Sequence, residues 1–93
     1  DGAPSYSLGD RKVRQSLPEP RYDNQSEGVV AVEISVDRNG NVTKAVAGVK
    51  GSTTLDEYLL REARDAAMKA KFDRNDNAPL LQKGTITYIF KLK

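Results

Sequence analysis

The side chains in this chain that could do acid–base or metal chemistry are carboxylates, because the sequence contains no cysteine and no histidine. The absence of these two residue types excludes Cys/His zinc sites, histidine ligation of haem, thiol chemistry and Ser-His hydrolysis. No spacing among the carboxylates requires two of them to converge on one point. The candidates are Glu33, Asp56, Glu57, Glu62 and Asp65. We therefore expect no catalytic residue and no enzymatic activity.

Two acidic stretches begin like the calcium-binding loop of an EF-hand, but neither completes the pattern. They are Asp37–Asn41 and Asp73–Asn77. The sixth position of that loop requires glycine, and here it holds Val42 or Ala78. The twelfth position requires glutamate, and both stretches have glycine there. We interpret both as turn sequences and expect no metal and no cofactor.

Charge argues against nucleic acid as a partner. The chain has 15 basic and 13 acidic residues in 93, and their signs are interspersed, so no basic field forms. Gly48–Gly51 matches the GxxG loop of KH domains, but that loop joins two helices, whereas here it follows a predicted strand. A nucleic-acid module would also need exposed aromatic residues on its sheet. Tyr88 and Phe90 are instead expected to point toward the core.

Two β-rich runs joined by Asn39-Gly40 show the clearest pattern in the sequence. Asn-Gly between such runs is the strongest short-range indication of a hairpin. We expect strands over about Gly28–Asp37 and Asn41–Val49. In the second run the apolar residues change parity after Val42, which predicts a β-bulge near Thr43–Lys44. In the first run apolar residues occupy every second position, the period of a half-buried strand: Val30, Val32, Ile34 and Val36.

A helix and a third strand follow the hairpin. Thr54 and Glu57 fit a capping box, so we expect an alanine-rich amphipathic helix over about Leu55–Lys71. Gly84–Lys93 has the alternation of a strand, and the right-handed crossover rule places it antiparallel beside the first strand. The predicted fold is α+β with ββαβ order: a three-stranded antiparallel sheet of order 2-1-3, with one main helix on one face.

The residues before the hairpin lack periodicity and contain three prolines, each of which favours extended backbone in its predecessor. We expect residues 1–19 to form an extended, flexible segment and residues 20–93 to form the domain. Leu17 and Tyr22 are the expected anchors, and a docked strand at Tyr6–Leu8 is the alternative. No apolar run approaches the length of a membrane span, and no signal peptide is present. Because the chain begins at Asp1, we expect a processed product or an excised piece.

From Pro20 to Lys93, about three quarters of the chain, the sequence resembles the C-terminal domain of TonB, the energy-transducing protein of Gram-negative envelopes. It departs from the family at Tyr22-Asp23, where Tyr-Pro is common, and at Phe72–Arg74, where Phe/Tyr-x-Pro is common. The residues that carry the resemblance are Glu27–Val32, Asn39–Val42, Leu55-Asp56, Ala66–Phe72 and Gly84–Phe90.

The resemblance implies a periplasmic adaptor without enzymatic activity. Its partner would be the TonB box, a short extended segment of an outer-membrane transporter. Residues 1–19 would end a linker that leads to an inner-membrane helix outside this chain and to a proton-driven motor, whose force would drive active uptake. Partner-binding residues are implied on the last strand and just before the first: Pro20, Arg21, Tyr22, Gly84, Thr85, Ile86, Thr87, Tyr88, Ile89, Phe90 and Lys91.

The residues agree with strand addition on physical grounds, since the last strand is expected to be a free sheet edge. Lys83, Lys91 and Lys93 flank that edge, which suits a selective site or a protected edge equally. Four apolar residues are expected on the uncovered sheet face: Val29, Ala31, Val46 and Ile89. They are equally consistent with scattered surface residues and with a patch that receives the N-terminal segment or a second copy of the domain in a homodimer. Two alternatives have different functions: a TonB-like peptide-binding domain of an envelope sensor or peptidase, and a small nucleic-acid-binding module.

Overall fold

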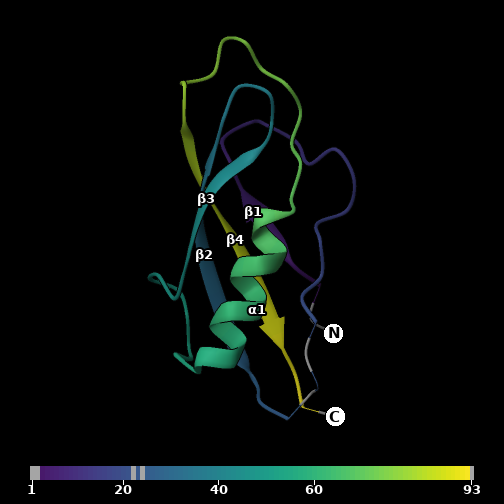
Figure 1. Ribbon diagram of the computed structural model, residues 1–93, viewed down its shortest axis with the longest axis vertical. Helices are drawn as coiled ribbons and strands as arrows, with labels where there is room; N and C mark the ends of the chain where they lie inside the picture. Colours follow the sequence, from purple (N-terminus) through teal and green to yellow (C-terminus); the bar gives the residue numbers. More distant parts are fainter. Residues whose placement is uncertain (1–2, 22, 24, 93) are drawn as a thin grey trace.

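The computed structural model describes residues 3–21, 23 and 25–92, which form one antiparallel sheet and one helix. The elements in chain order are β1 (Ser5–Ser7), β2 (Gly28–Val36), β3 (Val42–Ala47), α1 (Glu57–Met68) and β4 (Gln82–Phe90). The strand order is β1-β4-β2-β3, and α1 lies across one face of the sheet (Figure 1). The α+β class and the β3-β2-β4 part of the strand order match the prediction. The prediction of three strands is wrong, because β1 adds a fourth.

The hairpin forms as the alternation predicts. The four alternating apolar residues of β2 have no solvent exposure and make up the centre of the core. Ser35 pairs with Lys44, but the next residue, Val36, pairs with Val42. Thr43 is therefore the extra residue on β3, and the predicted bulge is confirmed. The bulge restores the parity that places both Val42 and Ala45 in the core.

The helix is shorter than the predicted Leu55–Lys71 and begins two residues later, at Glu57. Its N-cap is Asp56, whose carboxylate accepts a hydrogen bond from the amide of Leu59 at 3.1 Å. The predicted N-cap, Thr54, instead accepts from the amide of Asp56 at 3.1 Å. Aspartate is at least as good an N-cap as threonine, and its use leaves Leu55 exposed in the preceding loop. The buried stripe of α1 is small: Leu59, Ala63, Ala66 and Ala67.

The N-terminal segment completes the core, in contrast to the flexible segment expected for residues 1–19. Helix α1 lies mainly over β2 and β3 and makes few contacts with β4. The inner face of β4 is closed by the N-terminal segment, which runs beside the helix (Figure 1) and buries Leu8 and Leu17 in the core. Leu17 is therefore the anchor that the sequence predicted. The other expected anchor, Tyr22, lies outside the described residues.

A buried arginine ties this segment to three other parts of the chain. The side chain of Arg11 is 1% exposed. Its Nη2 donates to the backbone carbonyls of Asp37 at 3.0 Å and Asp73 at 2.6 Å, and its Nη1 donates to Gln82 Oε1 at 3.4 Å. Its Nε lies 3.5 Å from the Asp73 carboxylate. A buried guanidinium requires such partners, so the turn after β2, the loop after α1 and the start of β4 converge on Arg11.

Tyr88 on β4 carries the other notable polar group of the core. Its side chain is buried, and its hydroxyl has no hydrogen-bond partner among the described residues. Burial, and secondarily the negative charge of Glu19, raise the pKa of this phenol. The folded-state pKa lies above the ordinary value of about 10. Below about pH 10 the phenol is neutral in both the folded and the unfolded chain, so its titration takes nothing from the free energy of unfolding. Above about pH 10 the unfolded chain ionises first, and the free energy of unfolding falls as the pH rises further.

We expect Tyr88→Phe to stabilise the fold by about 1 kcal/mol at pH 7, because it removes an unpaired buried hydroxyl at nearly constant volume. The advantage over wild type should widen above about pH 10. Urea unfolding of both proteins at pH 7 and in the alkaline range measures this difference, to which the other tyrosines contribute equally. A variant that is less stable at pH 7 would show that the hydroxyl has a native partner.

Candidate functional site

The carboxylates of the described residues form no cluster of three or more that could hold a metal ion. Asp37 instead orders its turn, accepting from the amide of Asn41 at 2.9 Å, and Asn75 Oδ1 accepts from the amide of Asn77 at 2.9 Å. These bonds confirm the interpretation of both EF-hand-like stretches as turn sequences. Among the residues that the structure describes, no helix has the length and apolar character needed to cross a membrane. The sheet edges are the remaining candidates.

The hydrogen bonds of β2 show which backbone N–H and C=O groups of β4 face β2 and which face the outer edge of the sheet. The carbonyl of Ala31 accepts bonds from the loop that follows β3, so the backbone groups of Ala31 face β3. Those of the next residue, Val32, face β4 and its opposite residue Ile86. Thr85 and Thr87 flank Ile86 and alternate with it. Both threonines therefore direct their N–H and C=O groups away from β2, to the outer edge of β4.

That outer edge is occupied in part by the chain's own N-terminus. Ser5 pairs with Thr87 and Ser7 pairs with Thr85, in antiparallel register. The expectation of a free edge is therefore wrong for Thr85–Thr87. The next residue of the same parity is Ile89, which lies beyond the end of β1 and is 38% exposed. The edge is a place where an extended segment adds to the sheet, and this chain supplies one such segment itself.

The predicted site residues of β4 divide into two faces. Ile86, Tyr88 and Phe90 are buried in the core, so their side chains are closed to a partner. Thr85, Thr87 and Ile89 lie on the opposite face, which α1 does not cover, and Lys91 follows the strand as an exposed residue. Gly84 contacts β1. A partner strand would thus meet the β4 backbone and the Thr/Thr/Ile face.

Two side chains of the N-terminal segment, Tyr6 and Leu8, occupy two sites beside β4, which we call seats: one against Phe72 and Val13, the other against Gly84. The ring of Tyr6 meets that of Phe72 edge-on, with centroids 5.5 Å apart, and its hydroxyl oxygen accepts from the amide of Val13 at 3.1 Å. Leu8 is 1% exposed and lies against Gly84. A Cβ on Gly84 would stand 2.6 Å from Leu8 Cδ1 and 2.5 Å from the Ser7 carbonyl oxygen. Glycine at this position therefore makes room for the added segment.

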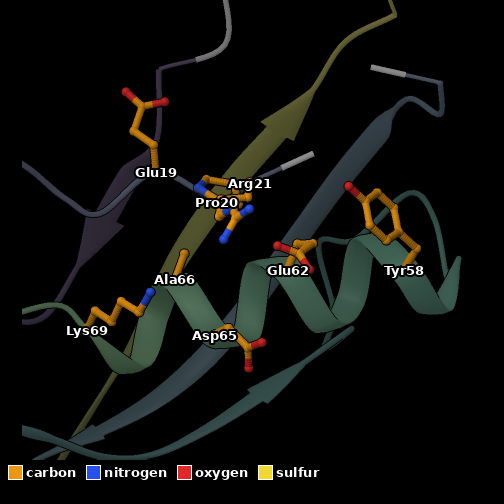
Figure 2. Close-up of a pocket in the computed structure, with 8 residues that line it drawn as sticks. All are labelled: Glu19, Pro20, Arg21, Tyr58, Glu62, Asp65, Ala66 and Lys69. Atoms are coloured by element: carbon orange, nitrogen blue, oxygen red, sulfur yellow. The ribbon is translucent and has the colours of Figure 1, made fainter. Parts of the chain in front are cut away.

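Pro20 and Arg21 lie elsewhere. With Glu19 they form one wall of a groove of about 480 Å³, and Figure 2 shows them across from residues of α1. The structure thus does not bring these two residues together with Thr85 and Thr87, and Tyr22, the third member of that predicted segment, is outside the described residues. The helix side of the groove is polar for the most part: Tyr58, Glu62, Asp65, Ala66 and Lys69.

The sequence suggested a docked strand at Tyr6–Leu8 only as the alternative to a flexible segment, and it gave no indication of the role of Arg11. The available indication was the spacing of Tyr6 and Leu8, two apolar residues separated by one polar residue, as in a strand. A run of three residues is too short to establish that period. Comparison of the chain with protein-family models, with curated protein sequences and with solved structures gives no match.

Proposed function

We propose that this domain is a non-enzymatic periplasmic adaptor of the TonB type. It binds an extended segment of an outer-membrane transporter by strand addition along β4 and transmits force from an inner-membrane, proton-driven motor through chain N-terminal to these residues. The observation that carries the proposal is the pairing of β1 with β4. It supports the proposal because the outer edge of β4 takes up an extended segment through backbone bonds and seats its side chains.

In strand addition most of the affinity comes from hydrogen bonds between backbone groups and less from side chains. The β4 edge fits this mode of binding, because the side chains of its alternate residues are buried and its backbone groups face outward. Thr85, Thr87 and Ile89 direct three pairs of backbone groups outward. Each net hydrogen bond contributes on the order of 1 kcal/mol, and association entropy offsets much of the sum. The isolated domain should therefore bind a transporter segment with a Kd on the order of micromolar or weaker.

Nucleic acid is not the partner in this proposal. Single-stranded nucleic acid is bound on sheets that expose aromatic residues for base stacking. The two aromatic residues of β4, Tyr88 and Phe90, are both about 1% exposed and belong to the core. The TonB-like sensor remains the alternative, and it would use the same edge without transmitting force.

We expect Ile89→Pro to weaken binding of a transporter's periplasmic segment at least tenfold. Proline removes the outward amide of Ile89, which lies beyond the end of β1, and leaves the bonds to β2 intact, since those come from the flanking residues. The matched control is Ile89→Val, which keeps the amide and the β-branched shape and should bind within about twofold of wild type. Fluorescence anisotropy with the labelled segment measures both variants.

NMR titration of labelled protein locates the contact independently. Amide shifts should cluster on Thr85–Lys91. Shifts confined to the opposite edge strand, β3, would place the partner there and contradict the proposal. Normal binding by a folded Ile89→Pro variant would do the same.

A further inference from the structure

We propose that β1 is a resting occupant of the β4 edge, and that the partner segment displaces it by filling the same two side-chain seats. The partner is then an extended peptide with an aromatic residue, preferably tyrosine, followed two residues later by an aliphatic one. This inference rests on the proposed function and adds to it the recognition pattern of the partner and the competition that controls access to the edge.

The length and exposure of β1 make it displaceable. It pairs over three residues only, Ser5 and Ser7 are exposed, and Tyr6 is half-buried. Leu8, which follows β1, is buried and must leave its site together with the strand. The attachment that stays in place begins at the buried Arg11. Gly9 lies between the two parts with φ +58°, a left-handed conformation that permits a sharp change of direction. Ser5–Leu8 can therefore leave the edge while Arg11 holds the rest of the segment in place.

The seats set the chemistry of the replacement. Departure of Tyr6 uncovers the ring of Phe72, which is otherwise fully buried, and leaves the amide of Val13 without its acceptor. Departure of Leu8 empties the space beside Gly84. A segment without matching side chains would leave apolar surface and an amide uncompensated. A segment with Tyr-x-Leu spacing restores every contact in exchange, and phenylalanine restores all but the bond to Val13.

The register defines which positions of the partner are read. Tyr6 lies opposite Ile86, on the core side of the sheet, whereas Ser5 and Ser7 lie opposite the outward-facing threonines. Backbone groups of the residues at the Ser5 and Ser7 positions thus bond to β4. Their side chains point to the uncovered face and are exposed, so small polar residues suffice there. The partner pattern is polar–aromatic–polar–aliphatic, antiparallel to β4.

The first experiment compares Ser7→Pro with Ser7→Ala in the full chain. Proline removes the amide that faces Thr85 and so releases β1 without altering β4, whereas alanine keeps the amide. Because apparent affinity scales with the fraction of molecules whose edge is open, Ser7→Pro should bind the transporter segment roughly tenfold more tightly than Ser7→Ala. Ser5→Pro, farther from the core, gives the same test if Ser7→Pro does not fold.

The second experiment uses a labelled synthetic peptide with the sequence of residues 3–9 of this chain. It should bind Ser7→Pro measurably more tightly than wild type, in which the edge is filled. Peptides that carry Tyr6→Ala or Leu8→Ala should bind Ser7→Pro at least fivefold more weakly than the parent peptide, and Tyr6→Phe should lie between. Equal binding of all four peptides would overturn the assignment of the two seats.

The two experiments separate this inference from the proposed function. If the transporter segment binds Ser7→Pro and Ser7→Ala equally well, displacement of β1 is overturned and the proposed function stands. If the residue 3–9 peptide behaves as expected and the transporter segment binds no variant, the proposed function fails and the seats stand. A wild-type dimer in light scattering that Ser7→Pro abolishes would assign the edge to β1 of a second copy, and would overturn the inference.

Discussion

Gly40→Ala should destabilise the domain by about 3 kcal/mol or more, the largest loss we expect from a single methyl group. Gly40 lies in the β2–β3 turn with φ +93°, and its carbonyl accepts from the amide of Phe72 at 2.8 Å. A Cβ at this position would overlap the Phe72 carbonyl group and approach the carbonyl oxygen of Asp73 at 3.1 Å. Relief requires moving backbone next to Phe72, whose side chain is fully buried. Thermal unfolding should show a decrease in Tm of roughly 12–24 °C.

The matched control is Gly51→Ala. Gly51 also has a left-handed φ, +106°, but the nearest atom to an added Cβ is the Cβ of Ala31 at an ordinary 3.5 Å. This variant should lose only the conformational cost, about 1 kcal/mol. Equal losses in the two variants would show that φ alone, and not the approach of the Phe72 backbone, makes glycine necessary at position 40.

Arg11→Met should cost about 3 kcal/mol and release the N-terminal segment. Replacing a whole buried ion pair with apolar residues can be neutral, but here two of the acceptors are backbone carbonyls that stay in place. The carbonyls of Asp37 and Asp73 would lose their donor in a site where the Arg11 side chain had excluded water. Each unsatisfied buried carbonyl costs roughly 1–3 kcal/mol. Urea unfolding measures the loss, and amide shifts of Tyr6 and Leu8 report release of the segment.

Arg14→Met is the control for Arg11→Met, because Arg14 is exposed and its backbone amide, which the substitution keeps, donates to the Lys71 carbonyl. Its stability should stay within about 0.5 kcal/mol of wild type. If Arg11→Met were equally stable, the carbonyls would have to find other donors, and Arg11 would not be the anchor that allows β1 to exchange. The two variants therefore also test the division between the displaceable strand and the fixed segment behind it.

The hairpin and its bulge could be predicted from the sequence because their causes are local. Alternation at period two selects the buried face of β2, and Asn39-Gly40 supplies the turn. The bulge at Thr43 follows from the parity change between Val42 and Ala45. The helix start was less determined, since Thr54 and Asp56 are both good N-caps within one turn of each other. Which of them caps the helix depends on where the loop after β3 ends.

The role of the N-terminal segment was decided by tertiary structure alone. Ser5 and Thr87 are opposite each other in the sheet although they stand at the two ends of the chain. A twelve-residue helix lies over β2 and β3, so the inner face of β4 needs a second cover. Short-range patterns in residues 3–17 gave only Leu17 as an anchor and Tyr6–Leu8 as an alternative strand, which is too little to predict that cover. The same requirement turns Arg11, an unremarkable charge in the sequence, into a buried anchor, because only the folded chain brings the carbonyls of Asp37 and Asp73 to one point. The sequence by itself determined strands β2, β3 and β4, the helix and the absence of cysteine and histidine chemistry, since each follows from residue types and short-range periods. Which strand borders β4, and so which segment a partner must displace, depends on contacts between distant residues and was settled only by the packing of the whole chain.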